Sequence, residues 1–198
     1  MAGVFLISVG LVAGSIFIMP KVKTMLRPAA GAFSFNNDSN NSGQVFNDVP
    51  ESSPYAAAIA FLKSRQIVAG YQDGTFKPDD KLKRDELAKL LVSAHGAIPH
   101  ELTNNYCFKD VKNEWFALYV CFAKSKGWVQ GYGDGKFYPE KYLSRDEAEK
   151  MISKSFGLKG SAESGSGGAA NDTALTQEIS RGEASDMLAT AIEAAGPL

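Results

Sequence analysis

The chain contains few of the residues on which most catalytic and metal sites depend. Two cysteines occur in its 198 residues, too few for a disulfide scaffold or a four-ligand zinc site. The two histidines, His95 and His100, fall in one short stretch, and no nucleophile stands beside a base. Acidic pairs such as Asp79-Asp80 are expected to be solvated loop charges. An enzyme is therefore the least expected class, and neither a metal nor a cofactor is predicted.

A surplus of basic residues is also missing. The net charge is −1, and the only charged residues among the first 35 are Lys21, Lys23 and Arg27. Of the 21 basic groups, 18 remain for the rest of the chain, against 22 acidic ones. A nucleic-acid binder needs a basic face that releases counterions from phosphates, so nucleic acid is excluded as a partner. The composition, 44% hydrophobic and 22% charged, is that of a globular protein.

Charge is absent altogether from residues 2–19. As a helix rising 1.5 Å per residue, this stretch would be roughly 27 Å long, about one bilayer core. It is predicted to form an N-terminal hydrophobic helix, with residues 1–27 a transmembrane anchor or an uncleaved signal segment. A cleaved signal peptide is the alternative, because Ala30-Gly31-Ala32 has the small residues of a cleavage site. The orientation stays open, since the basic residues after the segment favour the cytoplasm for that side.

Two other stretches lack any periodic pattern of apolar residues. Residues 28–44 include a run of asparagine and serine, and residues 158–178 are rich in glycine, serine and alanine. Such segments cannot bury enough apolar surface to offset the entropy of ordering. Both are predicted to be flexible linkers.

The most informative pattern is an internal repeat. Residues 70–86 recur 61 positions later as residues 131–147, without a gap and with ten of the 17 positions identical. Each copy is preceded by Phe-x-Asp-Val and an apolar, aromatic-rich segment, which predicts a first helix buried on most sides. Ser53-Pro54 is expected to cap this helix in the first copy. Repeats of this kind predict an all-α protein of helix–loop–helix units at residues 45–105 and 106–157.

A capping box opens the second helix of each unit. Ser144 and Glu147 have the spacing at which each side chain bonds the other's backbone N–H. Ser180 and Glu183 repeat that box, which predicts a partial third unit at residues 179–198 with a second helix only. Lys83 replaces the serine before Glu86, so the first cap should be weaker. The glutamates are thus explained by capping.

The arginines are not explained in this way. Arg84, Arg145 and Arg181 each fall at the first helical residue, where a cation opposes the helix dipole. Arginine offers a planar fork of donors that suits a carboxylate. A binding role would account for these positions.

The combined pattern, Phe-x-Asp-Val, Gly-Tyr-x-Asp-Gly-x-Phe-x-Pro and Leu-x-Arg-x-Glu, resembles the S-layer homology module. The resemblance implies three modules in a pseudo-threefold helical bundle, with ligand grooves between neighbours. It also implies non-covalent binding of a cell-wall polysaccharide, commonly one that bears a pyruvate ketal. Because the third unit is incomplete, at most two competent grooves are expected unless a second copy completes the ring.

The resemblance also assigns ligand-binding residues. Carried over by motif, they are the three arginines and two loops: Arg84, Arg145, Arg181, Gly70, Tyr71, Asp73, Gly74, Gly131, Tyr132, Asp134 and Gly135. Read from the residues alone, the two aspartates need be no more than turn formers. Trp115 stands where the family often has a tryptophan, and it could stack on a sugar or pack in the core.

Cys107 and Cys121 leave two readings open. They align with the small apolar residues Val45 and Ala60 of the first copy, which suits buried thiols. If the extended segment runs back along the first helix, the two cysteines could meet instead. In an exported protein a disulfide closing about 15 residues would contribute roughly 3 kcal/mol.

The leading hypothesis is a membrane-anchored protein that holds a cell-wall glycan. Its expected partners are a secondary cell-wall polysaccharide or peptidoglycan-linked glycan, and the membrane through residues 2–19. The alternative is an envelope scaffold that forms a homo-oligomer through its incomplete unit.

Overall fold

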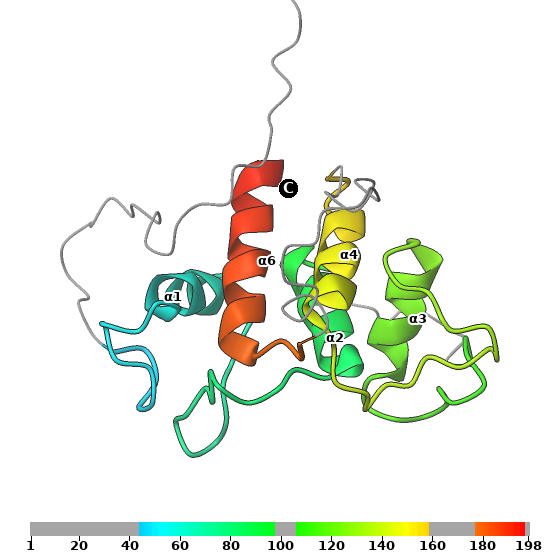
Figure 1. Cartoon of the computed structure of the whole chain (residues 1–198), viewed down its shortest axis with the longest axis horizontal. Coiled ribbons are helices and arrows are strands. Elements are labelled where there is room, and N and C mark those ends of the chain that lie inside the picture. The colour runs from blue at the N-terminus through cyan, green and yellow to red at the C-terminus, as the bar shows by residue number, and fades with distance from the viewer. Residues whose placement is uncertain (1–43, 98–105, 159–176, 197–198) are drawn as a thin grey trace, which may run out of the picture. The chain divides into compact units, whose positions relative to one another are not determined.

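The computed structural model describes residues 44–97, 106–158 and 177–196, all within one compact unit, residues 33–198. The helices there are α1 (Ala56–Ser64), α2 (Arg84–Ala94), α3 (Ala117–Ser125), α4 (Arg145–Ser155) and α6 (Arg181–Ala195). In these ranges extended segments pair only as isolated bridges. The all-α prediction is confirmed (Figure 1). The predicted N-terminal hydrophobic helix lies outside the described residues.

The predicted caps begin the second helices. In α4 the Ser144 hydroxyl accepts from the Glu147 N–H at 3.2 Å, and the Glu147 carboxylate accepts from the Ser144 N–H at 3.2 Å. Ser180 and Glu183 make the same pair of bonds in α6. In α2 Glu86 accepts from the Lys83 N–H at 2.9 Å, but lysine has no acceptor to return the bond.

The predicted cap of the first helix was wrong by two residues. The Ser53 hydroxyl accepts from the Tyr55 N–H at 3.3 Å. That bond closes a turn before the helix. Helix α1 begins at Ala56, and its N-cap residue, Tyr55, makes no side-chain capping bond. The local hydroxyl bond therefore competes with the helix at this position.

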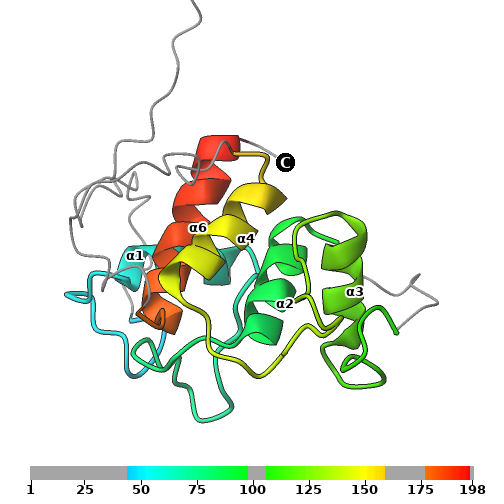
Figure 2. The ribbon, with the colours of Figure 1, turned by 45° about the vertical axis from the view of Figure 1, so that its right-hand side comes forward.

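The first helix of each repeat packs on the second helix of the preceding repeat. Helix α3 lies on α2, and α1 lies on α6, which places the first repeat after the third (Figures 1 and 2). Helix α4 contacts both α6 and α2. Leucine and isoleucine side chains that are almost wholly buried fill the contacts, namely Ile59, Leu62, Leu87, Leu91, Leu188 and Ile192. Burying each stabilises the fold by roughly 1.5–3 kcal/mol.

A closed cycle of backbone hydrogen bonds joins the three units. The segments before α2, α4 and α6 meet at Leu82, Leu143 and Ile179. Leu82 N–H donates to Ile179 O at 3.0 Å, Leu143 N–H to Leu82 O at 3.0 Å, and Ile179 N–H to Leu143 O at 2.9 Å. All three side chains are buried. Equivalent residues bonded in a cycle are the signature of a pseudo-threefold arrangement, as the fold prediction stated.

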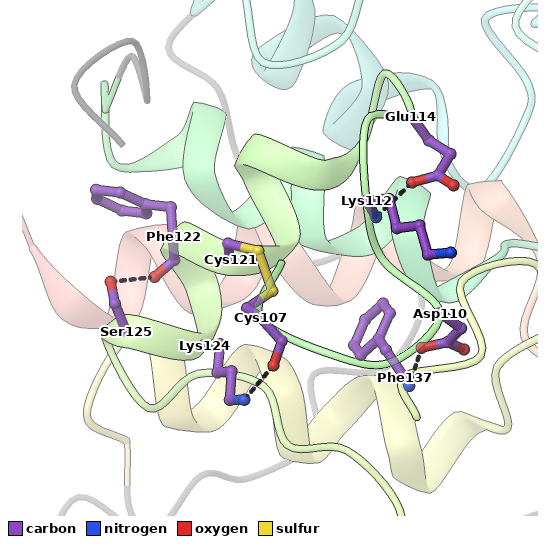
Figure 3. The surroundings of a disulfide bond; sticks show 9 residues. All are labelled: Cys107, Asp110, Lys112, Glu114, Cys121, Phe122, Lys124, Ser125 and Phe137. Carbon is purple, nitrogen blue, oxygen red and sulfur yellow. Dashed lines mark hydrogen bonds between the residues drawn. A yellow bond between two sulfur atoms is a disulfide. The ribbon is translucent and has the colours of Figure 1, made fainter. Parts of the chain in front are cut away.

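A disulfide joins Cys107 to Cys121, with their Cα atoms 5.4 Å apart. Figure 3 shows the bond linking the segment before α3 to α3 itself. The Lys124 ammonium also donates to the Cys107 carbonyl. Of the two readings that the sequence left open, the disulfide is the one that the structure contains.

Candidate functional site

Two aspartates that the sequence did not single out hold the Gly-Tyr-x-Asp-Gly loops. The Asp48 carboxylate accepts from the N–H groups of Phe76 and Lys77, both at 2.7 Å. Asp110 accepts from Phe137 and Tyr138 at 2.8 Å, and Figure 3 shows the first of these bonds. The sequence signal that could have identified these two residues is the aspartate present in both copies of Phe-x-Asp-Val. Each carboxylate anchors a loop 27 to 29 residues further along the chain.

The loop glycines are required by close packing and by turn geometry. A Cβ at Gly70 would lie 2.2 Å from the Phe46 ring, and one at Gly131 would lie 2.5 Å from the Phe108 ring. Gly74 and Gly135 have positive φ, at 79° and 82°, which closes the turn.

The aspartates of the same loops bond within their own turns. Asp73 accepts from the Thr75 N–H at 3.0 Å and from its hydroxyl at 2.6 Å. Asp134 accepts from the Lys136 N–H at 3.0 Å and from the Tyr138 hydroxyl. The hydroxyl bonds hold the pKa of both carboxyls below their usual range. Both aspartates therefore stabilise the turns, as the reading from the residues alone proposed.

Arg84 crosses from the first repeat into the loop of the second. Its side chain is only 6% exposed. Its Nε donates to Phe137 O at 2.9 Å and its Nη2 to Gln130 O at 3.1 Å. Its Nη1 lies 3.6 Å from the Glu147 carboxylate, and its guanidinium lies 5.0 Å from the centre of the Tyr132 ring. The cation at the start of α2 is thus neutralised by the neighbouring repeat.

Arg181 repeats this arrangement between the third unit and the first. Its Nε donates to Phe76 O at 3.0 Å, and its Nη1 lies 3.3 Å from the Glu86 carboxylate. Its guanidinium lies 5.1 Å from the centre of the Tyr71 ring. Phe76 and Tyr71 occupy the same loop positions as Phe137 and Tyr132. Two loops, each entered by an arginine, therefore form equivalent sites.

Arg145 differs from the other two arginines. It pairs with Glu183 at 3.2 Å, which completes a ring of three arginine–glutamate pairs around the pseudo-threefold axis. Its side chain is 34% exposed. No loop encloses it within the described ranges, which leave out residues 159–176. Among the described residues, the first two sites are therefore covered by a loop, and the third is not.

Glu147 is the centre of the site that Arg84 enters. Its carboxylate accepts from the Tyr132 hydroxyl at 2.6 Å and from the Lys141 ammonium at 2.9 Å. Burial opposes ionisation, but these two bonds hold the pKa of Glu147 below its ordinary value. The carboxylate therefore caps α4 and also links it to the loop and to the first repeat.

Each covered site borders a cavity. The one beside Arg84 has a volume of about 160 Å³ and is lined by Arg84, Trp128, Gln130, Gly131, Tyr132, Glu147, Lys150, Met151 and Lys154. The other is lined by Tyr71, Asp80, Lys81, Lys83, Glu86 and Tyr142. The second cavity, at about 460 Å³, falls within the range of full-sized small-molecule pockets, roughly 300–1,000 Å³, whereas the first is smaller. The first cavity therefore suits one small unit of a ligand.

The family model described as the S-layer homology domain matches residues 45–88 and 108–149. The two repeats are S-layer homology (SLH) domains. The matched ranges contain both loops, both of their glutamates and two of the three arginines. The last helix, α6, lies outside the matched ranges but begins with the same arginine and capping box.

Proteins of the bacterial surface carry similar stretches. A cellulosome-anchoring protein of Acetivibrio thermocellus is 30% identical over 61% of this chain and 28% of its own length. An S-layer protein of Bacillus licheniformis is 29% identical over 60% of this chain and 13% of its own. An uncharacterized cell wall amidase of Bacillus anthracis is 29% identical over 58% of this chain and 21% of its own. The chain thus spans less than a third of the length of each of these relatives.

Trp115 lies apart from both SLH cavities and lines neither. Its side chain is 57% exposed, with the Lys89 ammonium 5.5 Å from the ring centre. The core-packing reading of Trp115 is therefore wrong. Its ring lies 5.6 Å from the Phe116 ring, at the outside of the second repeat.

No helix in the described part of the chain is long and apolar enough to cross a bilayer. The segment predicted to do so, residues 2–19, lies outside that part.

Proposed function

We propose that this SLH chain binds a cell-wall polysaccharide non-covalently, on the extracytoplasmic face of the envelope. The observation that carries the proposal is the pair of covered sites in which an arginine of one unit enters the loop of the next. The SLH match and relatives named for anchoring and for the S-layer support a wall-binding role. One relative is named an amidase, but this chain corresponds to 21% of its length. The proposed role is binding rather than catalysis.

The ligand is proposed to be acidic, with a pyruvate ketal as the acidic group. The cavity beside Arg84 combines a guanidinium with the ammonium groups of Lys150 and Lys154. Arg84 is 3.6 Å from Glu147, the longest of the three arginine–glutamate contacts. A ligand carboxylate could therefore compete for that edge of the guanidinium. Residues 2–19 are proposed to hold the protein in the membrane, so that it tethers the membrane to the wall.

The test is binding of the full-length chain to purified sacculi of the source organism. Binding should fall sharply when the ketal pyruvate is removed by mild acid. Arg84→Gln should weaken binding by about 1.5–3 kcal/mol, roughly 10- to 150-fold, because it removes a charge-assisted contact. Arg145→Gln is the matched control, since it breaks an equivalent glutamate pair but lines neither cavity.

Equal loss in the two variants, at equal thermal stability, would contradict the assignment of the covered site. Retained binding to pyruvate-free sacculi would contradict the ketal alone. The alternative of a scaffold that oligomerises is tested separately by sedimentation of the full-length chain in detergent. A monomer at high concentration would exclude it.

A further inference from the structure

The two covered sites differ at positions that, in the second repeat, line the cavity beside Arg84. Trp128 lines the cavity beside Arg84, whereas the residue 61 positions earlier is Ile67, which is buried and lines neither cavity. Lys154 lines the same cavity, and its counterpart in the first repeat is Ser93. The second repeat thus adds an indole ring and an ammonium group to its cavity.

Trp128 is half-buried and held from behind. Its ring centre lies 4.2 Å from that of His95, with the planes inclined by 31°, and Phe122 meets it edge-on at 5.6 Å. His95 is itself fixed, since its two ring nitrogens lie 2.9 Å from Leu91 O and 3.0 Å from Ser155 O. These contacts tie the C-terminal ends of α2 and α4 together behind the indole. Trp128 lines the cavity from a position that is fixed before a ligand arrives.

An aromatic surface beside cations suits an acidic saccharide. The C–H groups on one face of a sugar ring are apolar and pack on an indole, while the ring edge keeps its hydroxyls in water. A carboxylate or phosphate on the same sugar can reach Lys150 or Lys154, which line the same cavity. The cavity volume of about 160 Å³ suits a single unit of this kind.

We propose that the cavity between the two SLH domains is the tighter binding site of this chain, and that Trp128 is its stacking residue for one sugar unit, with Lys150 and Lys154 holding the acidic group. The inference rests on the proposed function, because it names the residues that make one of the two sites selective. The site that Arg181 enters, with Ile67 and Ser93 at these positions, contributes less affinity.

Fluorescence isolates Trp128, because the chain has two tryptophans. In the full-length Trp115→Phe variant all indole emission comes from Trp128. Soluble polysaccharide released from the same sacculi should shift that emission to shorter wavelength as the ring loses water. Trp128→Ile on the same background restores the residue of the first repeat and should bind about tenfold more weakly. Lys154→Ser, the second repeat-matched change, should weaken binding about two- to fivefold.

The outcomes separate this inference from the proposed function. If the parent chain binds the polysaccharide but the Trp128 emission and the affinity of Trp128→Ile are unchanged, the stacking role is wrong and wall binding stands. If the parent chain does not bind, both fail. If Trp128→Ile does not fold, as judged by circular dichroism, the inference is tested by the emission of Trp128 and by the affinity of Lys154→Ser. An emission wavelength that does not change and an affinity of Lys154→Ser equal to that of the parent would overturn the inference.

Discussion

Single residues in this chain serve two purposes at once. Arg84, Arg145 and Arg181 begin their helices, where a positive charge is unfavourable next to the helix dipole. Each is offset by the carboxylate that caps the second helix of the next unit. The same glutamates therefore satisfy a helix end and join two repeats. The backbone is strained next to the carbonyls that accept from Arg181 and Arg84. Lys77 follows the first of these carbonyls and Tyr138 the second, and their φ angles are positive, at 57° and 56°.

Asp85 should make stability depend on pH. Its side chain is buried, at 4% exposure, and burial raises its pKa to about 6, against about 3.9 in an unfolded chain. The folded state therefore favours the protonated form, and its stability falls as the pH rises from about 4 through 6. Asp85→Asn should raise stability at pH 7 by about 1–2 kcal/mol, after allowance for solvent screening, and flatten this dependence.

Urea titrations between pH 4 and 7 measure the effect. The matched control is Asp146→Asn, because Asp146 occupies the equivalent position of the second repeat and is exposed. An Asp85→Asn curve that keeps the pH slope of the parent chain would show that another group causes it.

Gly131 should tolerate no side chain. A Cβ there would lie 2.5 Å from the Phe108 ring and 2.7 Å from the Lys136 carbonyl oxygen, and a backbone atom cannot move aside cheaply. Gly131→Ala should cost about 1–3 kcal/mol of stability by overpacking. Gly133→Ala, in the same loop with open space around it, should change stability by less than about 0.5 kcal/mol. Thermal melts of both variants test the loop geometry, and equal melts would contradict it.

At the scale of elements, α4 differs from the other second helices on one face. Gly182 of α6 lies against the Tyr55 ring, 2.4 Å from where a Cβ would stand. The equivalent residues are Asp85 of α2, which is buried, and Asp146 of α4, which is exposed. Likewise Ala88 of α2 and Ser185 of α6 are buried, whereas α4 has Glu149 there. The described α4 thus has a glutamate where α2 and α6, each of which packs against a first helix, have a small buried residue.

Helix α2 should gain from a better cap. Lys83 supplies no acceptor for the Glu86 N–H, which donates instead to the Asp85 carboxylate at 2.8 Å, whereas serine accepts in α4 and α6 at 3.2 Å. Lys83→Ser should stabilise the chain by about 0.5 kcal/mol, the low end for a cap, because it replaces a bond rather than adding one. The contact that it removes, 4.0 Å to the exposed Glu140, contributes little. Lys83→Ala removes the lysine without adding an acceptor, so a gain equal to that of serine in chemical denaturation would exclude the cap as the cause.

For the whole molecule, the backbone cycle joins the three units, and the disulfide closes a loop within the second repeat. Replacing Cys107 by valine and Cys121 by alanine introduces the residues that the first repeat has at these positions. It also removes a covalent link between residues that are 14 apart in the chain. This double variant should lose about 3 kcal/mol relative to the oxidised chain, because the unfolded state gains freedom. Reduced parent protein should lose a similar amount in urea titrations. A double variant as stable as the oxidised chain would show that the bond adds nothing to the fold.

The repeat register, the helices and two of the three caps could be predicted from the sequence. These features depend on residues three or four apart, such as Ser144 and Glu147, or on a copy at a constant offset of 61. The helix–loop–helix order, and the turn role of Asp73 and Asp134, are local in the same sense. Residues this close in the chain can adopt few relative geometries, so the structure agrees with the sequence prediction for these features.

The partners of the arginines could not be predicted, because they lie 38 to 105 residues away along the chain. The same holds for the burial of Asp85, the exposure of Trp115 and the position of Trp128 over His95. Each depends on which helix packs against which, and the cycle through Leu82, Leu143 and Ile179 sets that order. Contacts across the axis are governed by this packing and by the low dielectric of the interior, which no local spacing encodes.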